Sequence, residues 1–159
     1  MSRRRRRRHS TGFWLTAIIA GIVAAGGGSA AVLAPHGSGS CHGIGSVPAS
    51  MINGAARNIG ISCTVVRAQI SEESGGDPSV TSPAGAQGVA QFMPGTWSGD
   101  NCKGSPFSVG DAMTCYVIQM RGDLRANGGN LRDALAAYNA GQGNLQAGLG
   151  YADTILSAA

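Results

Sequence analysis

Apolar residues recur at helical spacing in the middle of the chain. They lie three and four positions apart over residues 48–59, as in a helix with one buried face, and Gly60 follows as a helix end. A second segment begins at Ser62, a residue suited to cap a helix, and extends to about Ser74, where two glycines and Pro78 stop it. The pattern predicts two consecutive helices.

The second half of the chain alternates loop composition with helical patterns. Residues 79–105 are rich in Gly, Ser, Pro and Asp around the apolar piece VAQFM, which predicts an ordered loop with a helical turn or two. A longer helix is expected from Ser108, which can cap together with Asp111 three residues on. No alternating strand pattern appears, so the expected fold class is mainly α. Further helices are expected at residues 130–140 and 151–156.

The N-terminal segment predicts a membrane anchor. Residues 13–34 carry no charge and are long enough to cross a bilayer core, which takes about 20 residues as a helix. Residues 3–8 are all arginine, and cationic flanks stay in the cytoplasm, so the remainder of the chain is expected outside. A cleavable signal peptide is the alternative, because small residues at 28–30 would suit signal peptidase. Both alternatives export the rest of the chain.

The predicted organisation is therefore one transmembrane helix followed by a single globular domain. A protein of 159 residues has room for one core and little more. The parts are a basic cytoplasmic tail (1–12), an anchor or signal sequence (13–34), a flexible linker rich in Gly, Ser and His (35–45) and the folded domain (46–159). We expect a single-pass protein of a bacterial cell membrane, or a secreted protein if the first segment is cleaved.

The charge distribution argues against a nucleic-acid partner. Half of the 12 lysines and arginines lie in residues 3–8. All eight acids lie beyond residue 34, where they outnumber the cations. A nucleic-acid-binding domain presents a clustered basic face to phosphates, and nothing after the arginine run offers one.

Four cysteines form an even set on the exported side, where disulfides persist. Three pairings are possible. We favour Cys102 with Cys115, which closes a short loop, and Cys41 with Cys63, which ties the first segment to a helix. A zinc site is disfavoured because there is no CxxC pair and few histidines. Free buried cysteines are the other alternative.

The positions of the histidines narrow the possible chemistry. The only three, His9, His36 and His42, precede the expected domain. Serine and cysteine hydrolases need an imidazole beside the nucleophile, and HExxH zinc enzymes need a histidine pair on a helix. Carboxylate catalysis without a metal or an organic cofactor is what the composition leaves open.

The best candidate for such a carboxyl is Glu73. It extends the apolar stripe of Cys63, Val66 and Ile70, whereas the adjacent Glu72 points about 100° away on the same helix. A carboxyl at the end of an apolar stripe has its charged form disfavoured and its pKa raised, as a general acid requires. The alternative is a glutamate at a helix end exposed to water.

Three sequence motifs, in this order along the chain, favour a catalytic role for Glu73 over an exposed glutamate. They are ES at residues 73–74, SPAGAQGVAQFMPGTW from Ser82, and ALAAYNAG from Ala134. Together they resemble the soluble lytic transglycosylase family over roughly residues 62–156. The resemblance implies a lysozyme-like fold, of the goose-type kind, around a saccharide-binding cleft. It implies a peptidoglycan lytic transglycosylase that cleaves the bond between N-acetylmuramic acid and N-acetylglucosamine, with residues 46–159 as the catalytic domain.

The resemblance also implies the roles of individual residues. Glu73 matches the glutamate that protonates the glycosidic oxygen and then takes a proton from the muramyl 6-hydroxyl, which leaves a 1,6-anhydro end. Ser82, Gln91 and Met93 align with cleft residues that position the sugar. Tyr138 and Asn139 match the AYN block that braces the catalytic acid, although Tyr138 could equally be a buried core tyrosine.

The sequence departs from the family pattern at two places. Gly76 stands where the family often has an aromatic residue, and residues 88–91 are smaller than in the family's GLMQ stretch. Met93 and Trp97 could therefore be core residues. A hydrolytic muramidase, a non-catalytic cell-wall-binding module and an accessory of a secretion or conjugation apparatus are the alternatives. The sequence does not predict an oligomeric state.

Overall fold

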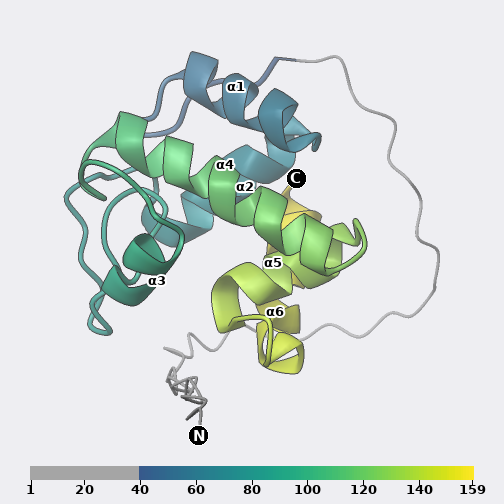
Figure 1. The fold of residues 1–159 in the computed structure, drawn as a ribbon. Coiled ribbons are helices and arrows are strands. Elements are labelled where there is room, and N and C mark those ends of the chain that lie inside the picture. The colour runs from purple at the N-terminus through teal and green to yellow at the C-terminus, as the bar shows by residue number, and fades with distance from the viewer. Residues whose placement is uncertain (1–39) are drawn as a thin grey trace, which may run out of the picture. The chain divides into compact units, whose positions relative to one another are not determined.

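The computed structural model describes residues 40–159, which form one helical domain (Figure 1). This confirms the mainly α fold class, since the only β pairing in the described part consists of isolated bridges. The helices are α1 (Ala49–Ile59), α2 (Cys63–Ser74), α3 (Pro94–Gly99), α4 (Val109–Ala126), α5 (Leu131–Ala140) and α6 (Leu145–Ala158).

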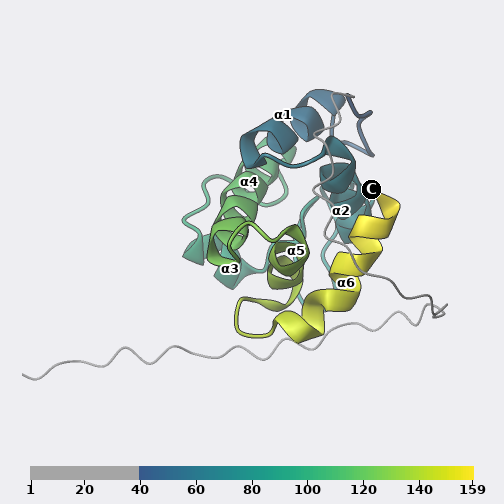
Figure 2. The same cartoon turned by 90° about the vertical axis from the view of Figure 1, so that its right-hand side faces the viewer.

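The five longer helices pack in a cyclic order. α1 packs against α2 and α4, α2 packs against α6, and α5 lies between α4 and α6. Figure 2 shows α6 running beside α2 although the two are separated by most of the domain's sequence. Because α2 is placed between the first and the last helix, its C-terminal end receives side chains from the end of the chain.

The helix starts follow the caps that the sequence predicts. The Ser62 hydroxyl accepts from the Thr64 amide at the start of α2, and the Ser108 hydroxyl accepts from the Asp111 amide at the start of α4. Asn130 caps α5 through the Asp133 amide. These local contacts satisfy amides that a helix start leaves without partners.

α2 is buried around most of its circumference, which the apolar stripe did not predict. Val66 and Ile70 are fully buried as expected. Val65 and Gln69, which share a helix face with the exposed Glu72, are buried as well. The helix is therefore central in the core. The face of Gln69 and the face of Ile70 are both buried, and they differ in exposure only in the last turn, at Glu72 and Glu73.

α6 begins six residues before the helix expected at 151–156. Two glycines in the sequence LQAGLGY argue against a helix from local preference alone. Gly148, however, lies so close to α5 that a Cβ atom there would be 2.2 Å from the Ala136 carbonyl oxygen. The close packing of α5 and α6 thus requires a glycine and stabilises the early helix start.

Two disulfides join Cys41 to Cys63 and Cys102 to Cys115, the pairing that the sequence favours. The backbone of Cys41 also exchanges two hydrogen bonds with the Asn53 side chain, each 2.9 Å long. Residues 41–45, expected as the end of a flexible linker, are thereby fixed to α1 and α2.

The expected anchor and most of the linker lie outside the described residues. Within residues 40–159, no helix combines the length and the apolar character needed to cross a membrane.

Candidate active site

Glu73 lies in the last turn of α2, where the helix ends at Gly75 in a left-handed conformation. The adjacent Ser74 fixes this end to the following loop: its hydroxyl donates to the Val89 carbonyl at 2.8 Å and accepts from the Gly76 amide at 3.1 Å. The two residues of the ES pair thus have different roles. Ser74 holds the loop in place, and Glu73 is free to face the interior.

The Glu73 carboxyl receives a hydrogen bond from a residue that sequence reasoning missed. The Tyr151 hydroxyl, on α6, donates to Oε1 of Glu73 at 2.5 Å. Tyr151 stands at a position that only tertiary packing brings to α2. Its sole signal in the sequence was its place as an aromatic residue in the last helical pattern.

The surroundings of Glu73 favour its protonated form. Part of the side chain reaches solvent, but protein atoms crowd the carboxyl, and this desolvation raises the pKa of Glu73 to about 7. The nearby charge of Glu72 acts in the same direction, while the hydrogen bond from Tyr151 opposes both. At neutral pH the group can therefore both give and take a proton.

Two more tyrosines stand around this carboxyl. The Tyr138 hydroxyl donates to the Ala90 carbonyl at 2.7 Å, and the Tyr138 ring packs edge-on against Tyr116 and Phe92, with centroids 5.8 and 6.3 Å apart. Burial, with the Glu73 charge second, raises the pKa of Tyr138 above its usual range. Tyr138 thus braces the loop at Ala90 and stands within electrostatic reach of Glu73, whereas the direct hydrogen bond to Glu73 comes from Tyr151.

The loop residues expected to position sugar also stabilise their own turns. The Gln91 amide donates to the carbonyls of Val80 and Gly88, at 3.3 and 2.9 Å. The Ser82 hydroxyl accepts from the Ala86 amide at 3.0 Å. These contacts explain how a loop rich in glycine holds one conformation beside Glu73.

Met93 and Asn139 are less constrained. Met93 is the partly buried N-cap residue of α3, and Asn139 is exposed near the end of α5. The structure therefore brings Glu73 and Tyr138 together through the loop at residues 88–91, and leaves Asn139 at the surface.

The absence of an aromatic residue at position 76 has a physical reason. Gly76 has a φ of 79° and lies against the backbone of Ile44, where a Cβ atom would be 2.2 Å from the carbonyl oxygen. The Ser46 amide donates to the Gly76 carbonyl at 2.9 Å. The N-terminal turn thus occupies the space that a side chain would need.

Asp123 and Asp100 form a second group of acids, and their charges, like that of Glu73, act on Tyr138. Asp123, on α4, is 8% exposed, and its Oδ1 accepts from the Gln142 amide at 2.8 Å. Burial raises the pKa of Asp123 to about 6, with a further contribution from the charge of Asp100. One oxygen of each carboxyl, Oδ2, is buried with no hydrogen-bond partner.

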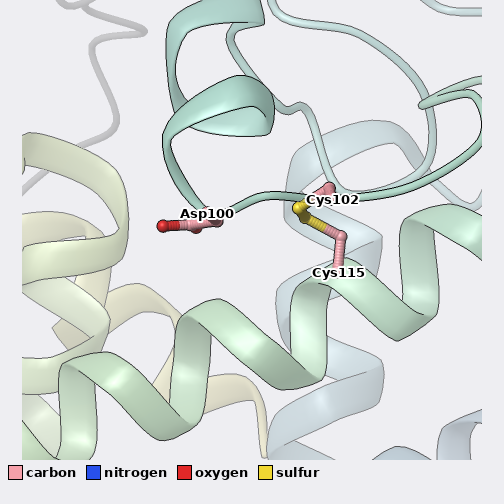
Figure 3. A group of neighbouring side chains, drawn as sticks. All are labelled: Asp100, Cys102 and Cys115. Atoms are coloured by element: carbon pink, nitrogen blue, oxygen red, sulfur yellow. A yellow bond between two sulfur atoms is a disulfide. The ribbon is translucent and has the colours of Figure 1, made fainter.

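Asp100 also lies close to Cys102 and Cys115, but these three residues do not form a metal site. The sulfurs are bonded to each other in a disulfide, and Figure 3 shows the Asp100 carboxyl directed away from them. A disulfide sulfur is not the thiolate that binds metals.

A surface hollow of the described domain does not include Glu73 in its lining. It has a volume of about 440 Å³, lies between α1 and α4, and is lined mainly by apolar atoms of residues such as Met51, Met113 and Ile118. Its lining includes no carboxylate, histidine or cysteine.

These features define a helical domain in which the crowded Glu73 carboxyl accepts from a tyrosine on the last helix, and a glycine-rich loop is bonded to the adjacent Ser74. The sequence pattern of the family described as "Transglycosylase SLT domain" matches residues 50–155. The chain therefore belongs to the transglycosylase SLT domain family.

Two solved structures share the fold. One is the 70 kDa soluble lytic transglycosylase of Escherichia coli, with a TM-score of 0.55 and 26% identity over 65% of this chain and 18% of that chain. The other is an inactive mutant of the lytic transglycosylase Slt of Pseudomonas aeruginosa, with a TM-score of 0.53 and 23% identity over 62% of this chain and 17% of that chain. This chain thus matches less than a fifth of the length of either protein.

Proposed function

We propose that the chain is a peptidoglycan lytic transglycosylase with Glu73 as its acid and base. In the first step the Glu73 carboxyl gives its proton to the glycosidic oxygen, and the bond from C1 of N-acetylmuramic acid to that oxygen breaks. In the second step the Glu73 carboxylate takes the proton of the muramyl 6-hydroxyl, and the oxygen of that hydroxyl bonds to C1. The proton returns to Glu73, no water is consumed, and the product has a 1,6-anhydro end.

The environment of the Glu73 carboxyl is the observation that carries this proposal. A group with a pKa of about 7 is divided between its two protonation states at neutral pH, which suits a residue that acts first as acid and then as base. The Tyr151 hydroxyl keeps a hydrogen bond on Oε1 and stabilises the carboxylate formed between the two steps.

Two further carboxyls, Asp77 and Asp123, are bonded within the domain, which is consistent with the anhydro product. Ordinary glycosidases use a second carboxylate about 5 to 9.5 Å from the first as nucleophile or base. Asp77 is engaged with Ser79, whose amide and hydroxyl both donate to its Oδ1. Asp123 accepts from Gln142 through Oδ1, and its Oδ2 is buried. A nucleophile supplied by the substrate removes the need for a second carboxylate.

Digestion of purified peptidoglycan tests the proposal. Mass spectrometry of the released muropeptides should find products lighter by one water than those of a hydrolase, and Glu73→Gln should release none. Glu72→Gln is the matched control, because Glu72 is exposed on the same helix turn, and it should retain activity. Hydrolysed ends instead of anhydro ends would assign a muramidase on the same scaffold. Full activity of Glu73→Gln would remove the mechanism.

We also propose that residues 13–34 hold the domain on the outer face of the cytoplasmic membrane. The uncharged segment after an arginine run supports this topology. The two disulfides are consistent with an oxidising compartment. Fractionation of cells that express the full chain tests the anchor: the protein should sediment with membranes, whereas cleavage at residues 28–30 would release it. A secretion or conjugation apparatus is the partner we would then seek.

A further inference from the structure

Gln69 is a fully buried amide one helical turn before Glu73 on α2. Residues three and four apart on a helix are neighbours on its surface, so Gln69 lies one turn from both Glu72 and Glu73. A polar side chain at 0% exposure in the core is costly unless its donors and acceptors are paired. Its partners therefore indicate what it does.

Both partners of Gln69 are on α4. The Tyr116 hydroxyl, itself fully buried, donates to Oε1 of Gln69 at 2.8 Å. The Gln69 amide nitrogen lies 3.8 Å from the Met120 sulfur. A thioether is only a weak acceptor, so the oxygen of Gln69 has a strong partner and the nitrogen has a poor one.

The strong contact with Tyr116 fixes the orientation of the amide. With its oxygen held by Tyr116, the nitrogen is directed at Met120. Glu73 bonds in another direction, to Tyr151 on α6. Two polar side chains one turn apart on α2 are thus directed to different helices.

The separation matters because the Gln69 nitrogen would otherwise be a second donor for the Glu73 carboxylate. Hydrogen bonds donated to a carboxylate stabilise its charged form and weaken its hold on the proton. The proposed general acid already accepts one such bond, from Tyr151. A second bond would leave less of the acid form at neutral pH.

We propose that Tyr116 is a positioning residue for the reaction: its hydroxyl holds the Gln69 amide toward α4 and so keeps a second hydrogen-bond donor away from the Glu73 carboxyl. This inference rests on the proposed function of Glu73. Burial is the main cause of the raised pKa of Tyr116, and the charge of Glu73 is the second cause. This second effect is consistent with the proximity of Tyr116 to Glu73. The other titratable groups that act on or are acted on by Glu73 are Tyr138, Tyr151 and the adjacent Glu72.

The test compares Tyr116→Phe with the double variant Tyr116→Phe/Gln69→Leu in the full chain. The single variant keeps the ring and frees the amide, so the high-pH limb of the pH–rate profile should move down by about one pH unit, the size of one added hydrogen bond to a charged group. The double variant has no amide to turn, so its limb should return to the wild-type position. Ile52→Val, a buried change in α1, controls for loss of stability and should not move the limb.

A direct titration separates this inference from the proposed function. Glu72 and Glu73 are the only glutamates in the sequence, so glutamate labelled with carbon-13 gives two carboxyl signals, and Glu72→Gln assigns them. The Glu73 midpoint should fall in Tyr116→Phe and recover in the double variant, whether or not peptidoglycan is cleaved. An unchanged midpoint in the single variant, or an equal fall in both, would overturn the inference.

Discussion

The Tyr151 hydroxyl donates a 2.5 Å hydrogen bond to Oε1 of Glu73 across 78 residues of sequence. The bond joins the last helix to the end of α2 and sets the balance of the carboxyl between its protonated and charged forms. Desolvation raises the pKa of Glu73 and this bond lowers it, so the value of about 7 is the outcome of two opposed effects. The predictions below follow from that balance and from the packing that maintains it.

Tyr151→Phe should move the high-pH limb of the pH–rate profile upward. The variant keeps the ring but removes the donor that stabilises the Glu73 carboxylate, so the pKa of Glu73 rises further, by about one unit. Activity measured on peptidoglycan from pH 5 to pH 9 checks this. A downward shift would show that the hydroxyl does not act through the carboxylate. Tyr116→Phe is expected to have the opposite sign, which makes each variant a control for the other.

Glu73→Gln should stabilise the fold in alkali and leave it unchanged in acid. The folded chain holds the Glu73 proton up to a pKa of about 7, whereas the ordinary pKa of a glutamate in the unfolded chain is 4.5. The folded state therefore binds the proton more tightly, and stability falls as pH rises between these two values. Above pH 8 the variant should exceed the wild type by on the order of 1 to 3 kcal/mol. Urea unfolding at pH 4 and pH 8 measures the difference, and a gap independent of pH would contradict the prediction.

Asp123→Asn should also stabilise the domain at high pH. Burial and the charge of Asp100 raise the pKa of Asp123 to about 6, so ionisation above that pH costs stability. An amide at this position carries no charge, so it is not subject to this cost or to the repulsion from Asp100. We expect a gain of about 1 to 2 kcal/mol at pH 8, and little change at pH 4.

Asp153→Asn is the control of opposite sign. Asp153 is an exposed carboxyl whose pKa is lowered by hydrogen bonding to Arg132, in an ion pair of 2.6 Å. The loss of this pair should lower stability slightly at neutral pH and not at acid pH. If both aspartate variants changed stability in the same direction, the assigned cause for Asp123 would be wrong.

Gly148→Ala should destabilise the domain by about 2 kcal/mol or more, because the added Cβ would lie 2.2 Å from the Ala136 carbonyl oxygen and would push α6 away from α5. The same shift would move Tyr151 away from Glu73, so activity should fall together with the melting temperature. Gly150→Ala is the matched control on the same helix: its Cβ would meet nothing within 4 Å, and alanine favours a helix by about 1 kcal/mol. Calorimetry of both variants checks the contrast, and equal effects would refute it.

Local patterns were sufficient for most of the helices and for placing Glu73 at the C-terminal end of α2. Cap residues such as Ser62, Ser108 and Asn130 act on amides two or three residues away, so their effect can be read directly from sequence. The stripe that ends at Glu73 likewise depends only on helical spacing. The order of the three motif blocks added the family.

The parts that local reasoning missed depend on distant neighbours. α6 starts before the predicted residue 151 because Gly148 permits close contact with α5. The sequence of α6 alone does not predict the stability that this contact adds. Gln69 lies outside the apolar stripe that ends at Glu73, yet it is buried, because its amide has a partner on α4.

The sequence by itself determined a helical domain with a carboxyl at the end of an apolar stripe, since helix periodicity and capping are short-range effects. Only the tertiary structure decided which groups surround that carboxyl. Tyr151 and Tyr116 reach Glu73 and Gln69 from helices far along the chain, and the pKa of an acid depends on what lies within a few ångströms of it, from whatever part of the chain it comes.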